Sequence, residues 1–387
     1  MPTVKKRKLL FIIDTLGGGG AERILAVLLK GLDRNHYHIT VASLYSNGFY
    51  EDTIREVADS VICMLPDISQ MKGIKKFIKR RKKTLLTKWI PLKWVWKLYL
   101  PTDSDVEIAF LEGFATRLLA ASPNRDSIKY AWVHCDIERF HWIKPWYRNY
   151  KHEQECFAAC DKVIGVSDEV TAAVQRLYNL KNTCTIINPI DFKEIIEKSK
   201  HSLFISPKKQ CALNLISIGR YTKQKGYLEL LKAIDILKNK KIAVHLRLLG
   251  EGEERELYEN FIQEKNLSEY IELTGFVNNP YPYIKQADLF VCSSIAEGYS
   301  TAITEALILG IPVISTDVPG IRRQLQNNRC GTIIGKSAKE IAQSILELIQ
   351  HPELIQQWKI NASTYVEDMK LADSMKKIIN LLNIPKH

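Results

Sequence analysis

Two glutamates, Glu297 and Glu305, lie eight residues apart just after the apolar run 287–292, which is typical of a buried strand. If a helix begins near Ser300, the N–H groups of residues 299–301 have no intrahelical acceptor and suit a phosphate. Eight residues at about 100° each return Glu305 nearly to the azimuth of Glu297, so both carboxylates can face one ligand and accept hydrogen bonds from sugar hydroxyls. The same pair also occurs on ordinary surface helices, because acidic residues favour helix N-termini.

Two cations follow another expected strand, 212–219. Arg220 offers a planar fork and Lys225 a point charge, which together suit a diphosphate. Cations in a loop are often only solvated surface, but these two are expected at the same end of the same sheet as Glu297. With a helix N-terminus beside them, they would neutralise a leaving diphosphate without a metal ion.

A glycine run, 17–20, follows the first expected strand and leads into Glu22. Glycines there allow backbone N–H groups to approach a phosphate or a bulky substrate closely. Because four glycines run together, the G-x-G-x-x-G fingerprint of dinucleotide sites is not met, and a turn without a ligand is the alternative.

His134 closes the expected strand 129–134 and is followed by Asp136. A histidine at a strand end can bind a ligand or fill a structural role. Neither residue has a second ligand pair at metal spacing, so no metal site is expected. The G-x-S-x-G motif of serine hydrolases is absent from the sequence.

These residues sit on alternating strands and helices, which predict an α/β fold with parallel sheets covered on both faces. The expected strands are 9–14, 38–44, 61–65, 106–111, 129–134, 162–166, 185–187, 212–219, 245–249, 270–273, 289–292, 312–315 and 331–334. The polar stretch 189–211, with Pro189 and Pro207, interrupts the series. We therefore expect Rossmann-like domains over 1–190 and 191–365, and a C-terminal helix in 366–387 that packs back on the first domain.

The length of 387 residues favours two domains. The eight cysteines are scattered without a C-x-x-C pair, which is typical of free thiols in a reducing cytoplasm. The basic N-terminus resembles a signal peptide, but Asp14 stops its apolar stretch, so a first strand is expected. No run approaches the roughly 18 apolar residues of a spanning helix.

The net charge of +12 is concentrated in 71–100, which holds eleven Lys or Arg residues and no acidic residue. The basic residues include Lys79, Arg80, Arg81, Lys82 and Lys83, and Trp89, Trp94, Trp96 and Tyr99 lie nearby. A nucleic-acid protein more often spreads such charge over a groove. The segment therefore predicts docking on an anionic membrane surface.

Taken together, the chain is similar to glycosyltransferase family 4, whose members have the GT-B fold of two facing Rossmann-like domains. The resemblance rests on motifs in a fixed order: Gly19 to Glu22, His134 with Asp136, 166–167, 188–191, Gly219-Arg220 with Lys225-Gly226, 249–252, Gly275 to Val277, the E-x7-E pair, and 310–314. It implies retaining transfer of a sugar from a nucleotide diphosphate to a hydroxyl, with no required metal.

The resemblance also implies residue roles. Arg220 and Lys225 would bind the diphosphate, Glu305 the ribose, Glu297 the donor sugar, and 275–277 the base. The full set expected at the donor is Gly18, Gly19, Arg220, Lys225, Gly250, Gly275, Phe276, Val277, Glu297, Tyr299, Ser300, Thr301 and Glu305, with His134 touching the donor sugar. Glu22 and Asp136 are expected on the acceptor side. Tyr299-Ser300-Thr301 departs from the family's commoner Phe-Gly-Leu type of sequence.

The leading hypothesis is a cytoplasmic glycosyltransferase, peripheral on the inner face of the cytoplasmic membrane, that uses a nucleotide sugar in surface polysaccharide or glycolipid assembly. A UDP-sugar is favoured over a GDP-sugar, and the acceptor would be lipid-linked or a glycan. One alternative is a nucleotide-sugar epimerase of the same fold, which would isomerise or hydrolyse the donor without an acceptor. The other is a non-catalytic nucleic-acid-binding protein, suggested only by the basic segment.

Overall fold

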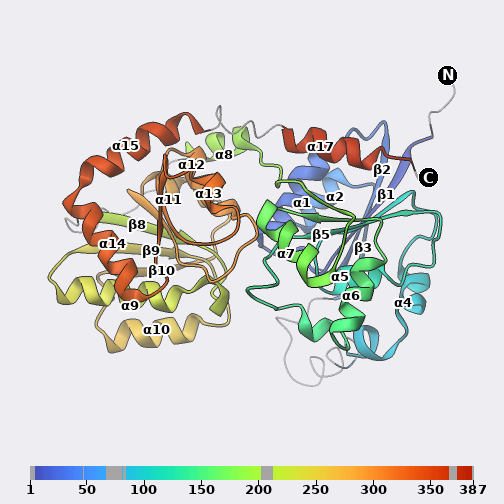
Figure 1. The fold of residues 1–387 in the computed structure, drawn as a ribbon, viewed down its shortest axis with the longest axis horizontal. Helices are drawn as coiled ribbons and strands as arrows, with labels where there is room; N and C mark the ends of the chain where they lie inside the picture. Colours follow the sequence, from blue (N-terminus) through green and yellow to red (C-terminus); the bar gives the residue numbers. More distant parts are fainter. Residues whose placement is uncertain are drawn as a thin grey trace. The chain divides into compact units, whose positions relative to one another are not determined.

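The computed structural model describes residues 5–46, 48–66, 81, 84–201, 212–365 and 373–385. The chain divides into two compact units, one of Met1–Ile190 with Ala372–His387 and one of Asp191–Leu371 (Figure 1). The division between units thus falls after Ile190, and the tail joins the first unit from Ala372 rather than from residue 366.

The first unit contains a seven-stranded parallel sheet in the order β3-β2-β1-β4-β5-β6-β7. Its strands are β1 (Arg7–Ile13), β2 (Tyr37–Tyr45), β3 (Ser60–Leu65), β4 (Val106–Ala109), β5 (Ile128–Val133), β6 (Lys162–Gly165) and β7 (Thr183–Thr185). Its helices are α1 (Gly20–Lys30), α2 (Glu51–Val57), η1 (Leu85–Trp89), α4 (Leu92–Tyr99), α5 (Phe114–Leu119), η2 (Lys144–Trp146), α6 (Tyr150–Ala158), α7 (Asp168–Tyr178) and α17 (Asp373–Leu382).

The second unit contains a six-stranded parallel sheet in the order β10-β9-β8-β11-β12-β13. Its strands are β8 (Leu213–Ile218), β9 (Val244–Leu249), β10 (Ile271–Gly275), β11 (Leu289–Cys292), β12 (Val313–Thr316) and β13 (Gly331–Ile334). Its helices are α8 (Phe192–Ser199), η3 (Lys223–Lys225), α9 (Tyr227–Asn239), α10 (Arg255–Glu264), α11 (Tyr281–Lys285), α12 (Thr301–Ile308), α13 (Ile321–Gln324), α14 (Ala338–Gln350) and α15 (Pro352–Ser363).

Both sheets are covered on two faces, because parallel strands are joined by crossover connections that place helices over the sheet. In the second unit, α9 and α10 lie on one side of the strands and α11 and α12 on the other (Figure 1). The helix α9 packs on β9 and α14 on β13, and the two helices pack against each other, with Leu230, Ile234, Leu246 and Ile341 fully buried. This packing fixes the loops at the strand ends.

The thirteen expected strands are all present, with ends that differ by at most two residues from the expected ones. One expectation was wrong. The polar composition of 189–211 predicts a connection, but α8 begins inside it, capped by Asp191 through a 2.9 Å bond from the N–H of Glu194. An aspartate three residues before a glutamate is a helix-start signal, and the two prolines obscured it.

The C-terminal helix α17 packs on the first unit. The hydroxyl of Tyr130 on β5 donates to the carbonyl of Leu381 at 3.0 Å, and the hydroxyl of Tyr37 on β2 donates to the side chain of Asn383 at 2.8 Å. Ile378 and Leu382 are fully buried. The chain therefore returns to its first unit after completing the second.

Candidate functional site

The second unit has a topological switch point between β8 and β11. These strands are neighbours in the middle of the sheet, whereas β9 follows β8 on one side and β12 follows β11 on the other. Ligands of open parallel sheets bind beyond the carboxyl ends of the strands at such points. The loop after β8 carries Arg220 and Lys225, and the loop after β11 carries Glu297, so the topology brings these two loops to one place.

The two loops are joined through their backbones. The N–H of Ile295 donates to the carbonyl of Gln224 at 2.7 Å, and the side chain of Gln224 donates to the carbonyl of Ala296 at 2.8 Å. Gly226 has a positive φ of 64°, and a Cβ there would lie 2.2 Å from the carbonyl oxygen of Ser293. Only glycine fits this close approach without strain. The spacing between the loops is therefore fixed by backbone geometry.

Lys225 and Glu297 form an ion pair across the two loops. The distance from Lys225 Nζ to Glu297 Oε1 is 2.6 Å, and the hydroxyl of Ser294 donates to the same oxygen at 2.7 Å. The Glu297 residue is only 9% exposed, whereas Arg220 on the same loop as Lys225 is exposed. A phosphate arriving here would meet an exposed guanidinium and an ammonium already held in position by a carboxylate.

The helix α12 begins beside this pair. Its first residue is Thr301 and its N-cap is Ser300, which makes no side-chain capping bond, so the expected helix start near Ser300 is confirmed. The first N–H groups of a helix have no intrahelical acceptor and favour an anion. Together with Lys225 and Arg220, they make the carboxyl edge of this sheet a candidate site for a doubly charged phosphate group.

A buried glutamine that no motif singles out holds the start of α12. Gln324 on α13 is fully buried, and its Nε2 donates to the carbonyl of Ser300 at 2.7 Å and to the hydroxyl of Thr304 at 2.8 Å. The ring of Tyr299 lies against Gly320, where a Cβ would come within 2.7 Å of the ring. These contacts hold the N-terminus of α12 in place.

The remaining expected donor residues lie at the carboxyl ends of β9, β10 and within α12. The N–H of Gly250 donates to the carbonyl of Gly275 at 2.9 Å, which ties the ends of β9 and β10 together. Phe276 is 47% exposed, while Val277 is half-buried. Glu305 is buried on α12. Each of these residues is in the second unit.

In the first unit, the glycine run ends at the N-cap of α1. Gly19 is that N-cap, and a Cβ on it would lie 2.4 Å from the carboxylate of Glu22. Glu22 is buried, and its carboxylate therefore folds back against the turn, while Gly18 is exposed. A side chain at position 19 would therefore displace the carboxylate of Glu22 from the turn.

The first unit has its own switch point, between β1 and β4, where an unexpected carboxylate lies. Glu112 is 1% exposed and accepts hydrogen bonds from the N–H of His134 at 3.0 Å and from the indole N–H of Trp142 at 3.2 Å. Burial raises the pKa of Glu112 to about 7, against the lowering effect of these two donors. The sequence feature that could have identified Glu112 is its position just after the expected strand 106–111.

His134 itself is a neutral imidazole. Burial lowers its pKa to about 3, and Nε2 is among the buried polar atoms without a hydrogen-bond partner in the described part of the chain. Its ring packs against Phe110, with ring centroids 4.8 Å apart. A buried nitrogen without a partner costs free energy, so a hydroxyl of a ligand would satisfy His134 while the ring stays uncharged.

The ionisation of Glu112 predicts a pH dependence. Because its pKa is higher in the folded state than the ordinary value of 4.5, folding stability falls as pH rises from about 4.5 through about 7. At 1.36 kcal/mol per unit, the full loss is about 3 kcal/mol above pH 7. Glu112→Gln cannot ionise at this position. We therefore expect the difference in free energy of unfolding, variant minus parent, to rise by up to this amount between about pH 4.5 and about pH 7.

Denaturant unfolding followed by tryptophan fluorescence at about pH 5 and about pH 8 measures this difference. The probe reports mainly on the first unit, because six of the seven tryptophans have numbers below 190 and only Trp358 lies in the second unit. A difference between variant and parent that stays the same at both pH values contradicts the prediction.

The other expected first-unit residues have identifiable contacts. Asp136 is buried and accepts from the N–H groups of Glu138 and Arg139 at 3.0 and 3.1 Å, which shapes the loop after β5. Trp89 and Arg81 are exposed, whereas Lys79, Arg80, Lys82 and Lys83 lie outside the described residues. Trp96, grouped above with the membrane-facing aromatics, is fully buried, so that part of the expectation was wrong.

No group of three or more His, Cys, Asp or Glu side chains in the described ranges has the arrangement of a metal site. Within those same ranges, no helix combines the length and the apolar character that a membrane crossing requires.

Residues 198–365 match the family model described as glycosyl transferases group 1. The chain is 25% identical over 384 residues, 96% of its length and 100% of the relative's, to the N-acetylgalactosamine-N,N'-diacetylbacillosaminyl-diphospho-undecaprenol 4-alpha-N-acetylgalactosaminyltransferase of Campylobacter jejuni. It is also 25% identical, over 97% of its length and 98% of the relative's, to the alpha-1,4-N-acetyl-D-galactosaminyltransferase of the same organism that is named for GalNAc-alpha-(1->4)-GalNAc-alpha-(1->3)-diNAcBac-PP-undecaprenol.

Among solved structures, that of Anabaena HepE in complex with UDP and glucose superimposes with a TM-score of 0.74 at 17% identity, covering 97% of this chain and 99% of that one. This likeness establishes the fold as GT-B. With the matched glycosyl transferase domain and the full-length relatives, it follows that this protein is an enzyme of the glycosyltransferase class, of the hexosyltransferase type.

Proposed function

We propose that this enzyme transfers a sugar, with retention at the anomeric carbon, from a nucleotide diphosphate to a hydroxyl of a lipid-linked or glycan acceptor, in surface polysaccharide or glycolipid assembly. The observation that carries the proposal is the ion pair of Lys225 and Glu297 beside the N-terminus of α12, at the switch point of the second sheet. A UDP-sugar is favoured as donor, in line with the UDP complex of the HepE structure. A lipid-linked acceptor is in line with the undecaprenol-linked compounds in the names of both relatives.

In this proposal, the second unit stabilises the leaving group. Departure of a nucleoside diphosphate builds negative charge on the β-phosphate, and preorganised cations and N–H dipoles lower the energy of that transition state. Arg220, Lys225 and the first N–H groups of α12 supply this charge. Glu305 binds the ribose, residues 275–277 bind the base, and Glu297 binds the donor sugar through the carboxylate that also positions Lys225.

His134 is proposed as a hydrogen-bond partner of the donor sugar. With a pKa of about 3, its imidazole stays neutral near pH 7 and does not serve as a proton donor to the leaving group. Its role is therefore recognition, through the Nε2 atom that has no partner within the described chain.

The proposed enzyme requires no metal ion, because Arg220, Lys225 and the helix N-terminus already supply positive charge at the diphosphate. The one D-x-D triplet, Asp103-Ser104-Asp105, lies at the amino end of β4, where Asp105 accepts from the backbone N–H of Lys8 at 2.7 Å and Asp103 pairs with the Lys8 side chain. Its carboxylates are thus engaged at the edge of the first sheet away from the strand carboxyl ends.

A thermal-shift screen in excess EDTA tests donor class and metal independence together. We expect UDP at about 100 times its Kd to raise the Tm of the second unit by about 5 °C or more, and GDP to raise it less. Stabilisation that appears only after a divalent ion is added, or that favours GDP, contradicts the corresponding part of the proposal.

Two controls separate the alternative functions. Incubation with a UDP-sugar but no acceptor leaves the donor sugar intact if the protein is a transferase, whereas an epimerase isomerises it. Stronger binding of nucleic acid than of nucleotide sugar, with a steep dependence on salt, would instead favour a nucleic-acid-binding protein.

We further propose that the enzyme works in the cytoplasm, on the inner face of the cytoplasmic membrane. All seven cysteines for which the structure describes a state are free thiols, which agrees with a reducing compartment. The basic segment 71–100 supplies eleven positive charges that attract anionic lipid.

A further inference from the structure

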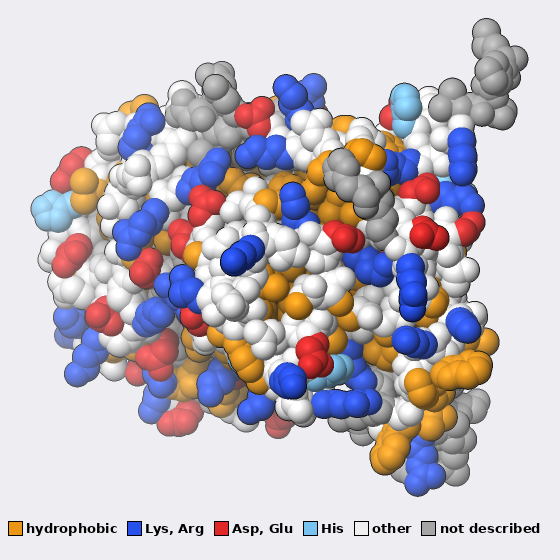
Figure 2. All heavy atoms as spheres, turned by 45° about the vertical axis from the view of Figure 1, so that its right-hand side comes forward, with side chains coloured by type: hydrophobic (Ala, Val, Ile, Leu, Met, Phe, Trp, Pro, Cys, Tyr) orange, Lys and Arg blue, Asp and Glu red, His pale blue; other side chains and the backbone are white. Residues whose placement is uncertain are grey.

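The outer face of α4 is apolar and open to solvent. Trp94 and Leu98, one helical turn apart, are 67% and 73% exposed, and Trp89 at the end of the preceding η1 is 76% exposed. These are the three most exposed large hydrophobic side chains in the described ranges, and they fall within ten residues of one another. Figure 2 shows hydrophobic side chains gathered with Lys and Arg at the lower right, over this part of the first unit.

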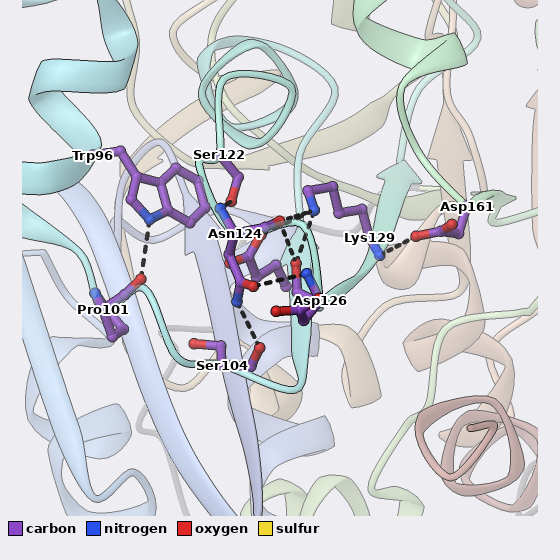
Figure 3. Close-up of polar contacts among 10 residues, drawn as sticks. Trp96, Pro101, Ser104, Ser122, Asn124, Asp126, Lys129 and Asp161 are labelled. Carbon is purple, nitrogen blue, oxygen red and sulfur yellow. Dashed lines mark hydrogen bonds and ion pairs between the residues drawn. The ribbon is translucent and has the colours of Figure 1, made fainter. Parts of the chain in front are cut away.

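The exposure does not come from a poorly packed helix. The inner face of α4 places Val95 and Trp96 in the core, and the Trp96 indole N–H donates to the carbonyl of Pro101 at 3.0 Å (Figure 3). The preceding η1 is held by Arg117, whose guanidinium donates to the carbonyl of Thr87 at 2.7 Å. A helix that is apolar on both faces is normally buried on both. The inner face already packs in the core, so packing within this unit does not account for the apolar character of the outer face.

The charged residues of η1 and α4 are all lysines. Lys93 and Lys97 are exposed on α4, and Lys97 Nζ lies 5.7 Å from the ring centroid of Trp94. No acidic residue occurs between positions 71 and 100. Tryptophan favours the interface between water and acyl chains, and lysines beside it bind anionic headgroups with their stems along the apolar surface.

We propose that Trp89, Trp94 and Leu98 form a membrane-insertion face that enters the acyl boundary of an anionic bilayer, with Lys93 and Lys97 at the headgroups. The proposal deepens the proposed function by naming the side chains that hold the enzyme at its lipid-linked acceptor. It rests on that function only for the acceptor, since nucleotide binding belongs to the second unit.

A second copy of this chain fits the face less well than lipid does. In a symmetric dimer the same patch meets itself, so Lys93 and Lys97 would face the lysines of the other copy with no acidic residue from the segment to compensate. An anionic bilayer instead complements both the aromatic and the cationic side chains.

The test compares the full-length parent with the variant Trp89→Ser, Trp94→Ser, Leu98→Ser in co-sedimentation with vesicles of phosphatidylcholine, with and without phosphatidylglycerol. We expect the parent to bind the anionic vesicles and the triple variant to bind them at least 10-fold more weakly. Ile360→Ser is the matched control, because Ile360 is 64% exposed on α15 of the second unit, and it should bind like the parent. The UDP-induced rise in Tm should be unchanged in both variants.

A second measurement uses only the parent protein, in case the triple variant folds poorly. Brominated phosphatidylcholine mixed with phosphatidylglycerol should quench its tryptophan fluorescence, because Trp89 and Trp94 are the exposed tryptophans of the first unit. The proposal is overturned if the parent shows no quenching, if the folded triple variant binds vesicles like the parent, or if the substitutions dissolve a dimer in analytical ultracentrifugation without changing vesicle binding. Loss of vesicle binding with an intact UDP response supports the proposal, whereas an absent UDP response in every variant would instead count against the donor assignment.

Discussion

Lys225→Ala and Arg220→Ala are each expected to lower kcat by about 100-fold or more. Each side chain is proposed to meet negative charge that develops on the leaving diphosphate, and removal of one such donor typically costs this much. Arg220→Ala is the cleaner of the two tests, because Arg220 is exposed and its removal leaves the core intact. Arg220→Lys keeps the charge but loses the planar fork, so an intermediate rate is expected from it.

Lys223→Ala is the matched control for these variants. Lys223 is exposed on η3, the same turn that carries Lys225, and has no role in the proposed site. Lys225→Ala also deprives the buried carboxylate of Glu297 of its cation, so its folding must be checked by circular dichroism and Tm. If both Arg220→Ala and Lys225→Ala turn over at nearly the parent rate while Lys223→Ala does too, the diphosphate site has been misplaced.

The second large effect is expected at Glu297. Glu297→Gln removes the charge that holds Lys225 at 2.6 Å and replaces one of the two carboxylate oxygens proposed for the donor sugar with an NH2 group, so transfer should fall by about 100-fold while UDP alone still binds. Glu305→Gln should act differently, because its proposed partner is the ribose. We expect it to weaken the binding of UDP about 10-fold, in line with loss of a hydrogen bond to a charged group.

Calorimetric titration with UDP, which lacks the sugar, distinguishes the two carboxylates. A parent-like Kd for Glu297→Gln with a raised Kd for Glu305→Gln supports the division of roles. Equal loss of UDP affinity in the two variants would falsify it, and would indicate that Glu297 acts mainly through Lys225 on the phosphates.

The sequence by itself determined the elements and the candidate segments. Buried strands leave continuous apolar runs that are local in the chain, which is why each of the thirteen strands was placed to within two residues. The start of α12 was equally local, because a polar turn after β11 leads directly into it. Residues at strand ends, such as His134 and Arg220, could be selected because parallel sheets collect ligands at their carboxyl edge.

The tertiary structure decided how those residues are used. The partners Lys225 and Glu297 are 72 positions apart and meet only because β8 and β11 are neighbours in the sheet. Gln324 left no trace in the sequence, since a buried glutamine on a short helix resembles any polar surface residue until its partners on α12 are known. Glu112 cannot be told apart from other acidic residues in the sequence, because only the fold buries it and thereby raises its pKa to about 7.

The tryptophans of α4 show the same limit. Trp94 and Trp96 are two positions apart in an apolar and basic stretch, and composition alone does not distinguish a buried tryptophan from an exposed one. The helix that begins after Pro91 turns them in different directions, so Trp96 is buried against the core and Trp94 is left in solvent. Composition thus determined that this segment is basic and aromatic, whereas the phase of the helix against the sheet, a property of tertiary packing, decided which side chains are available to a membrane.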